Sequence, residues 1–319
     1  MENRPKRVAV MMGGNSSERE ISLRTGGQIS KALREKDFEA REFDAADRFI
    51  INLEEFNPDV VFIALHGKYG EDGTIQGLLE MLGYAYTGSG VLASALAMDK
   101  VMSKKVFTAE GITTPAYRSF RKEDIVDRER ARDELAELLS YPVIVKPSRQ
   151  GSTIGISRAG NRAELEQALE LAIQFDDELL VEQFIEGMEV TASVLGTRNP
   201  EVLPLIEIIS DTGFYDYEAK YNLSLSHHII PARVAPEIAL KIERIALRAY
   251  QALNCRQFAR VDFILSAEQV PYVLEVNTIP GLTETSLFPD SAKAVGISFS
   301  DLVARLVNEA WLLKKEGAR

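Results

Sequence analysis

Cysteine and histidine are scarce in this chain of 319 residues. A single cysteine, Cys255, excludes an intrachain disulfide, and one cysteine with three histidines cannot form a closed Cys/His zinc site. Long hydrophobic runs are lacking as well, because the longest clear one, residues 60–65, is far too short to span a bilayer. These absences argue against a secreted disulfide scaffold and against a membrane protein.

Positive charge is also in deficit. Lys and Arg number 37 against 48 Asp and Glu, which gives a net charge of −11. A net anion is a poor partner for nucleic acid or for an anionic membrane surface. The apolar stretch 8–12 runs into Gly13 and is too short for a signal-peptide core, so we expect a cytoplasmic protein. With 45% hydrophobic and 27% charged residues, the chain is typical of a globular protein that buries a full core.

The first hundred residues alternate between short β-prone runs and helical patterns. Strands are expected at 8–12, 40–43 and 60–65, and helices at 22–34 and 74–82. The continuous apolar run 60–65 is typical of a parallel sheet that is covered on both faces. This alternation predicts an open α/β layer, in which ligands bind at the carboxyl ends of the strands.

The pattern changes after Asp99, a candidate cap for a helix that runs to Glu110. Helices are also expected at 121–139, which is highly charged, and at 236–253, which is amphipathic. Further strands are expected at 142–146, 179–184, 190–195, 203–209, 260–265 and 272–276. Residues 210–233 form a polar segment without a clear period, and a loop of that length inside a compact domain is usually functional.

Three oxygen-bearing side chains stand on two predicted strands. Glu275 and Asn277 are two residues apart and therefore project from the same face of their strand. If the strand that carries Asp262 pairs with it, the three side chains converge, and such hard oxygen ligands suit Mg²⁺ that also holds nucleotide phosphates. The alternative is a solvated strand face with ordinary polar alternation.

Two glycine-rich loops also follow predicted strands. The loop 147–155, after Lys146, combines glycines with hydroxyl side chains, a composition that suits an anionic phosphate chain; the alternative is a flexible hairpin turn. The loop that begins at Gly13 precedes a helix, whose N-terminus favours an anion or is simply capped by its serines. His66, at the end of the apolar strand, is a site candidate or an ordinary polar group, whereas His227 and His228 have no acidic residue at metal-ligand spacing and read as loop residues.

Five segments, taken in order, resemble the D-alanine–D-alanine ligases. They are residues 13–22 (GGNSSEREIS), 66–73 (HGKYGEDG), 215–221 (YDYEAKY), 260–262 (RVD) and 275–281 (EVNTIPG). The resemblance implies an ATP-grasp fold, of α/β and α+β class, with an N-terminal open parallel α/β domain. The implied parts are an N-terminal substrate-binding domain (1–99), a central ATP-grasp subdomain (100–188) and a C-terminal ATP-grasp subdomain (189–319) with a lid at about 210–233.

The reaction that the resemblance implies is the ATP-dependent ligation of two D-alanine molecules for peptidoglycan precursor synthesis. ATP phosphorylates the first carboxylate, the second amine attacks the D-alanyl phosphate, and ADP and phosphate are released. Glu18 would bind the first ammonium, and Ser152 and Tyr221 would join it in a bridge that shuts the lid against water. The other implied substrate residues are His66 near the first carboxylate, Arg260 and the Gly281 N–H at the oxyanion, and Ser286 and Leu287 at the second carboxylate.

The resemblance also implies the cofactors ATP and two Mg²⁺ ions, for which Mn²⁺ can substitute. The ions would be held by Asp262, Glu275 and Asn277. The implied nucleotide residues are Lys100, Lys146 and Lys220 at the phosphates, Ser152 in the phosphate loop, Glu182 at the adenine amino group, Phe184 and Ile185 at the adenine ring, and Glu189 at the ribose. A homodimer is implied on the same ground.

Tyr221 bears on the second substrate, because in this family tyrosine there accompanies an amine acceptor and phenylalanine a D-lactate acceptor. We therefore expect a dipeptide product. The rival interpretations are an ATP-grasp ligase for another substrate and a catalytically inactive nucleotide-binding regulator. The first is opposed by Glu18, Ser152 and Tyr221, and the second by the presence of Arg260 and all three metal-ligand candidates.

Overall fold

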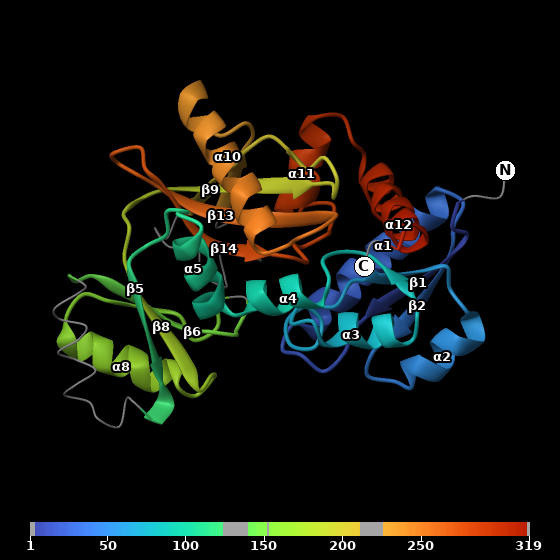
Figure 1. The fold of residues 1–319 in the computed structure, drawn as a ribbon, viewed down its shortest axis with the longest axis horizontal. Helices are drawn as coiled ribbons and strands as arrows, with labels where there is room; N and C mark the ends of the chain where they lie inside the picture. Colours follow the sequence, from blue (N-terminus) through green and yellow to red (C-terminus); the bar gives the residue numbers. More distant parts are fainter. Residues whose placement is uncertain (1–3, 124–139, 152, 211–225, 318–319) are drawn as a thin grey trace.

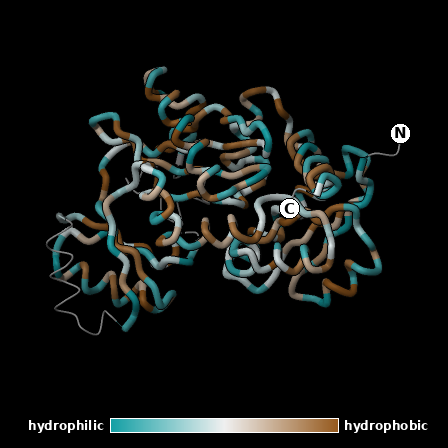
Figure 2. Tube along the Cα trace, in the orientation of Figure 1, coloured by the Kyte–Doolittle hydropathy of each residue, from teal (hydrophilic) through white to brown (hydrophobic). Residues whose placement is uncertain are grey.

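The computed structural model describes residues 4–123, 140–151, 153–210 and 226–317, which form three parts with one sheet each (Figure 1). The N-terminal part is blue to cyan, the central part is green, and the C-terminal part is yellow to red. In the same orientation, hydrophobic residues concentrate inside each part and hydrophilic ones in the outer turns (Figure 2). Among the described helices, none combines the length and the apolar character needed to cross a membrane.

The N-terminal part contains a parallel sheet in the order β2-β1-β3-β4. All four residues of β3 are buried, as the apolar run predicts. The strands and helices expected here are confirmed, with shifted bounds. The elements are β1 (Arg7–Met12), α1 (Arg19–Glu35), β2 (Glu39–Asp44), α2 (Phe49–Phe56), β3 (Val60–Ile63), α3 (Thr74–Met81), β4 (Ala85–Tyr86) and α4 (Val91–Met98).

The central part is an antiparallel sheet in the order β5-β8-β6-β7. Asp99 caps the helix α5, since its Oδ1 accepts the N–H of Met102 at 3.0 Å. The helix expected from Arg121 is wrong at its start, because Arg121 pairs with Glu178 as the last residue of β5; residues 124–139 lie outside the described chain. The elements are α5 (Lys100–Ala109), β5 (Tyr117–Arg121), β6 (Val143–Pro147), β7 (Ser157–Ala159), α8 (Arg162–Ala172) and β8 (Glu178–Gln183).

The C-terminal part is an antiparallel sheet in the order β12-β11-β9-β13-β14, with β10 beside β9. Its elements are β9 (Gly187–Leu195), β10 (Glu201–Val202), β11 (Ile206–Ser210), β12 (Ser226–Ile229), α10 (Pro236–Ala252), β13 (Phe258–Ser266), β14 (Pro271–Asn277), α11 (Leu287–Ala294) and α12 (Phe299–Lys315). The expected loop at 210–233 is wrong at residues 226–229, which pair with β11 as strand β12. Residues 211–225 lie outside the described chain.

The last helix, α12, packs on the first, α1, and so returns the end of the chain to the N-terminal part (Figure 1). Leu302, Val303 and Leu306 are fully buried in one cluster with Val8 and Val10 of β1. Ser298 begins α12 by accepting the N–H of Asp301 at 3.1 Å. Because α12 contacts α11 as well as α1, its packing joins the C-terminal part to the N-terminal part through apolar contacts.

Candidate active site

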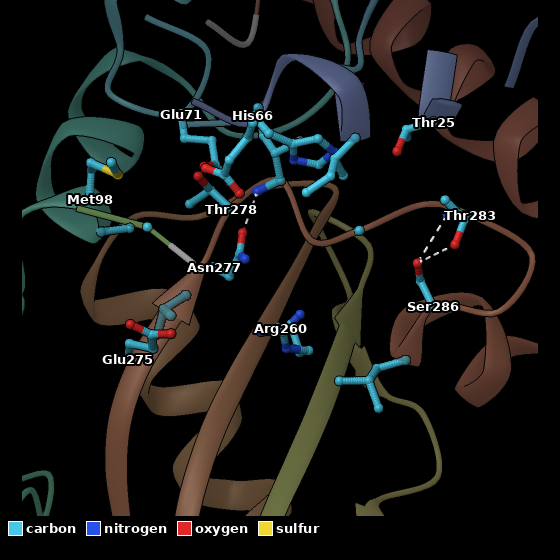
Figure 3. A pocket seen from close by; sticks show the side chains of 18 of the residues that line it. Thr25, His66, Glu71, Met98, Arg260, Glu275, Asn277, Thr278, Thr283 and Ser286 are labelled. Carbon is cyan, nitrogen blue, oxygen red and sulfur yellow. Dashed lines mark hydrogen bonds between the residues drawn. The ribbon is translucent and has the colours of Figure 1, made fainter. Parts of the chain in front are cut away.

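A cavity of about 210 Å³ lies where the three parts meet (Figure 3). It is lined by residues from the loop after β3, the start of α1, the α4–α5 junction, the start of β13, the end of β14 and the start of α11. The structure therefore brings together nine of the residues predicted from the sequence, which are Glu18, His66, Lys100, Arg260, Glu275, Asn277, Gly281, Ser286 and Leu287.

Glu18 is a buried carboxylate, 8% exposed, at the N-terminal end of α1. Two glycines leave room for it. A Cβ on Gly67 would lie 2.7 Å from Oε2 of Glu18, and a Cβ on Gly151 would lie 3.1 Å from the same oxygen. Gly67 also has a φ of +70°, which L side chains rarely adopt. The loop after β3 and the loop after β6 thus approach one carboxylate from two sides.

His66 and Glu71 both belong to the loop that follows β3 and line the same cavity (Figure 3). The charge of Glu18, which also lines the cavity, acts on both side chains. The Nε2 atom of His66 is buried and has no hydrogen-bond partner among the described residues. Burial lowers the pKa of His66, against the opposing effect of Glu18, so the imidazole favours its neutral form. Burial and the Glu18 carboxylate raise the pKa of Glu71 to about 8, although its carboxylate accepts the Gly67 N–H at 2.7 Å.

Lys100 places a buried positive charge at the wall that α5 contributes. Its Nζ donates to the carbonyl of Gln150 at 2.7 Å and lies 3.5 Å from Oε2 of Glu275. The backbone N–H of Lys100 donates to the carbonyl of Ser148, whose hydroxyl in turn donates to Asp99 at 2.8 Å. The phosphate-loop candidate after β6 is therefore fastened to the start of α5, and Lys100 contacts both the loop and the strand β14.

Arg260 holds Asp262 in a two-point ion pair beside the cavity. The guanidinium donates from Nε and Nη2 to the two carboxylate oxygens at 2.8 and 2.7 Å, and the hydroxyl of Thr191 donates to Oδ1 at 2.6 Å. Such paired hydrogen bonds fix orientation as well as charge. Arg260 and Asp262 share one face of β13, and Arg260 lines the cavity, whereas Asp262 is not among the lining residues.

The three metal-ligand candidates come from paired strands, as expected. Asp262 lies directly opposite Glu275 in the β13–β14 register, and Asn277, opposite Arg260, is two residues further along. The amide oxygen of Asn277 accepts the N–H of Ile279 at 3.0 Å. Among the described residues no group of three His, Cys, Asp or Glu side chains could hold a metal ion. Two carboxylates and an amide oxygen nevertheless form a hard donor set that fits Mg²⁺.

The far end of the cavity is the start of α11. Ser286 stands at the N-cap of that helix, and its Oγ lies 2.7 Å from the Thr283 hydroxyl and accepts the Thr283 N–H at 3.1 Å. Gly281 must stay small there, because an added Cβ would lie 3.0 Å from the Ser286 Oγ. Leu287 is the first residue of α11, so this end of the cavity meets a helix N-terminus, which favours an anion.

A second group of predicted residues lies on β6 and β8. Glu182 is 2% exposed and forms ion pairs with Lys146 and, at 2.8 Å, with Lys104. Burial disfavours the charge of Glu182, yet the two lysines lower its pKa below the ordinary value. Burial likewise opposes the charge of Lys146, but Glu182 outweighs it and raises the pKa of that lysine. The structure thus pairs Lys146 with Glu182, the residue expected at adenine.

Three further predicted residues, Phe184, Ile185 and Glu189, are absent from the described lining of this cavity. Phe184 and Ile185 follow β8, and the Arg158 guanidinium lies 4.7 Å above the Phe184 ring. Glu189 stands on β9 opposite Ile208 and Ile264. Three expected residues, Ser152, Lys220 and Tyr221, lie outside the described residues.

Sequence reasoning missed four residues of these groups. Glu71 lies inside the quoted 66–73 segment, and Lys104 is four residues after Lys100, so both had a recognisable signal. The interpretation of His228 as a loop residue is wrong, because it belongs to β12, lines the cavity and lies 3.3 Å from Asp290 of α11. Sixty-two residues separate that pair, so no local pattern reveals it.

Comparison with known proteins agrees with this geometry. The family model of the D-ala D-ala ligase N-terminus matches residues 41–89, and that of the C-terminus matches residues 106–308. A D-alanine–D-alanine ligase from Carboxydothermus hydrogenoformans is 54% identical over 302 residues, covering 94% of this chain and 97% of the relative. One from Pelotomaculum thermopropionicum is 50% identical over 306 residues, covering 95% and 96%.

Solved structures show the same fold. A Bacillus anthracis D-alanine–D-alanine ligase complexed with ATP superposes with a TM-score of 0.84 at 33% identity, covering 98% of this chain and 99% of that one. The VanG D-Ala:D-Ser ligase from Enterococcus faecalis gives 0.82 at 33% identity, covering 96% and 99%. The ATP-grasp fold expected from the sequence is confirmed. With both family models matched and relatives near half identical over almost its whole length, the chain belongs to the D-alanine–D-alanine ligase family.

Proposed function

We propose that this protein joins two D-alanine molecules to D-alanyl-D-alanine at the expense of ATP, for peptidoglycan precursor synthesis. The observation that carries the proposal is that the Glu18 carboxylate, Arg260 and the start of α11 line one cavity. A carboxylate suits an ammonium group, and a helix N-terminus suits a carboxylate. Two amino acids placed head to tail have this complementary charge pattern.

The chemistry then proceeds in two balanced steps. A carboxylate oxygen of the first D-alanine attacks the γ-phosphorus of ATP, the bond to ADP breaks, and D-alanyl phosphate forms. The amine of the second D-alanine attacks the carbonyl carbon, loses a proton, and expels phosphate from the tetrahedral intermediate. Arg260 and the N–H of Gly281 would stabilise the oxyanion of that intermediate, an effect worth about 3 kcal/mol per donor in such sites.

The substrate roles follow from position in the cavity. Glu18 would hold the ammonium of the first D-alanine, and His66 lies beside Glu18, near the first carboxylate. Ser286 and Leu287 would receive the carboxylate of the second D-alanine at the start of α11. Because His66 favours its neutral form, it adds a hydrogen-bonding group without a second positive charge.

The nucleotide would bind between the central and C-terminal parts. Lys100, Lys146 and Lys220 would meet the phosphates, with Ser152 in the phosphate loop. Glu182 would accept a hydrogen bond from the adenine amino group, Phe184 and Ile185 would contact the adenine ring, and Glu189 would contact the ribose. The buried position of Glu182 and the charge of Lys146 beside it support these assignments.

Asp262, Glu275 and Asn277 would hold two Mg²⁺ ions, with Mn²⁺ as a substitute. The chemistry supplied by bound ions is neutralisation of phosphate charge during transfer. The proposal is supported by the direct pairing of Asp262 with Glu275 across β13 and β14. Arg260 orients Asp262 from the same strand, and Lys100 lies beside Glu275, so the chain holds both carboxylates in place.

We also propose that a lid within the expected segment of about 210–233, apart from the strand residues 226–229, closes over the site through a bridge among Glu18, Ser152 and Tyr221. Closure would exclude water from the acyl phosphate. The division into parts 1–99, 100–188 and 189–319, a cytoplasmic location and a homodimer belong to the same proposal.

Phosphate release with ATP and Mg²⁺, measured across D-alanine, D-serine and D-lactate, tests the proposed function. We expect phosphate release when D-alanine is the only amino acid added, and a dipeptide product, because residue 221 is tyrosine. The absence of phosphate release with D-alanine would refute the reaction. Substantial D-lactate incorporation at neutral pH would refute the assignment of the acceptor.

A further inference from the structure

Lys104 is a buried cation that the roles proposed above leave without a function. Its side chain is 1% exposed, and it lies on α5 one turn after Lys100. The two lysines nevertheless serve different sites, because Lys100 reaches Glu275 while Lys104 reaches Glu182. Full burial of an ammonium is costly unless every N–H finds an acceptor.

Three oxygens surround the Nζ of Lys104. The ammonium donates hydrogen bonds to the hydroxyl of Thr114 at 2.7 Å and to the carbonyl of Pro115 at 3.3 Å, and it forms an ion pair with Oε2 of Glu182 at 2.8 Å. The Nζ of Lys104 also lies over the aromatic ring of Tyr117, 5.4 Å from the ring centroid, in a cation–π contact. Since Tyr117 lies opposite Glu182 in the β5–β8 register, the ammonium is held in a rigid frame.

This frame reaches the strand that carries Glu275 and Asn277. The hydroxyl of Thr114 donates to the carbonyl of Val273 at 2.8 Å, and the Val273 N–H donates to the carbonyl of Thr113 at 2.9 Å. Val273 lies on β14, two residues before Glu275. Lys104 therefore connects β8 of the central part with β14 of the C-terminal part through one bridging side chain.

Lys146 is held differently. Its ammonium pairs with Glu182, and among the described residues Glu182 is the one carboxylate within ion-pairing distance of it. Its side chain is 12% exposed, against 1% for Lys104. Ile144 faces Glu182 in the β6–β8 register, so Lys146 reaches it diagonally from two residues along β6. Lys146 can therefore leave Glu182 for an anion more readily than Lys104 can.

We propose that Lys104 is a positioning residue of the nucleotide site, where it acts as the fixed counterion of Glu182 and frees Lys146 to bind the nucleotide phosphates. The inference rests on the proposed function, in which Glu182 accepts a hydrogen bond from the adenine amino group. Before the nucleotide binds, two lysines share one carboxylate. Once Lys146 turns to the phosphates, Glu182 would be a lone buried charge without Lys104. With Lys104 in place, Glu182 stays charged and oriented toward the adenine amino group.

The decisive variant is Lys104→Met, which keeps the length of the side chain and removes its charge. Lys105→Met is the matched control, since Lys105 is exposed on the same helix. Calorimetric titration of each purified variant with ADP gives the affinity. We expect Lys104→Met to weaken ADP binding about tenfold or more, the size of a lost charge-assisted hydrogen bond. Lys105→Met should match the wild type.

Two further readouts separate positioning from general damage. Inosine diphosphate carries a 6-oxo group where ADP carries the amino group, and a charged Glu182 disfavours it. We expect the preference for ADP over inosine diphosphate to fall in Lys104→Met. In a Glu182→Gln background the same substitution should no longer weaken ADP binding, because Lys104 acts through that carboxylate.

Thr114→Val keeps the inference testable if Lys104→Met does not fold. It removes one acceptor of Lys104 and keeps the charge, so a smaller loss of ADP affinity is expected, again absent with Glu182→Gln. Equal losses in both backgrounds, or an unchanged nucleotide preference, would overturn the inference. The proposed reaction is tested separately, by phosphate release from the wild-type protein with D-alanine. If the wild-type protein binds ADP but leaves D-alanine unreacted, the proposed reaction is refuted, and the ADP titrations still test the role of Lys104.

Discussion

The position that a Cβ on Gly67 would take is 2.7 Å from Oε2 of Glu18, so this glycine defines the space in which the carboxylate lies. The two residues are 49 positions apart in the chain, and they meet because β1 and β3 are neighbours in the parallel sheet. A side chain at position 67 would therefore displace the Glu18 carboxylate, which is the proposed binding group for the first ammonium.

We therefore predict that Gly67→Ala raises the KM for the first D-alanine about tenfold or more, because Glu18 must move away from the added methyl group. Gly83→Ala is the matched control. Gly83 has a φ of +75° but nothing within 4 Å of an added Cβ. Both variants should lose about 1 kcal/mol of stability from the positive φ. Steady-state phosphate release checks this, and equal KM values in the two variants would contradict it.

Glu275 supplies a second prediction, which concerns turnover. Glu275→Gln keeps the size of the side chain but removes the charge that the metal proposal requires. We expect kcat to fall by about 10³-fold or more, with the melting temperature within a few degrees of the wild type. Glu268→Gln, at an exposed position in the same hairpin, should leave kcat unchanged. A near-normal rate for Glu275→Gln would refute its role.

Local patterns predicted most of this fold because they act over short distances. The apolar run that becomes β3, the Asp99 cap of α5 and Pro236 in the first turn of α10 each determine structure within a few residues. The strands β13 and β14 followed from the same logic, whereas their pairing was only a condition in the sequence and is shown by the structure. The separation of Glu275 and Asn277 by one residue sufficed to place both on one face of a strand.

Other features depend on contacts between distant segments. The pair of His228 with Asp290, and the meeting of Lys104 with Glu182, arise only when separate elements pack together. The orientation of Asp262 is similar, since Thr191 of β9 and Arg260 decide which way its carboxylate turns. Residue type alone indicated that these side chains were polar and left their partners open.

Glu71 yields a prediction about pH. The pKa of its carboxyl is raised to about 8 by burial and by Glu18, with Glu275 adding to the rise and Lys100 opposing it. In the unfolded chain a glutamate has a pKa of about 4.3. Between these values the folded protein binds a proton that the unfolded chain has lost, so the free energy of unfolding decreases as pH rises from about 5 to 8.

Glu71→Gln removes this effect. The melting temperature of the ligand-free variant should exceed that of the wild type by an amount that grows from pH 5.5 to pH 8.5, at about 2–4 °C per kcal/mol. Glu55→Gln, an exposed substitution on α2, is the control and should follow the wild-type curve. A constant difference between Glu71→Gln and wild type across this range would contradict the prediction. Calorimetric melting at each pH provides the measurement.

The two-point contact between Arg260 and Asp262 leads to the last prediction. The guanidinium donates to both carboxylate oxygens at 2.8 and 2.7 Å, and Arg260 also lines the cavity, where the proposed function has it stabilise the oxyanion. A lysine has one ammonium and cannot reproduce this planar fork. Arg260→Lys should therefore lower kcat by about 10²-fold or more, even though the charge is kept.

Arg305→Lys is the comparison, because Arg305 forms a surface ion pair with Glu201 at 3.0 Å on α12, where such pairs contribute little. We expect its kcat to equal that of the wild type. If Arg260 supplied charge alone, Arg260→Lys would keep most of the rate, so the ratio of the two kcat values separates geometry from charge. Because Asp262 would lose its paired donors, the Mg²⁺ concentration for half-maximal rate should change in Arg260→Lys as well, and it should stay constant in Arg305→Lys.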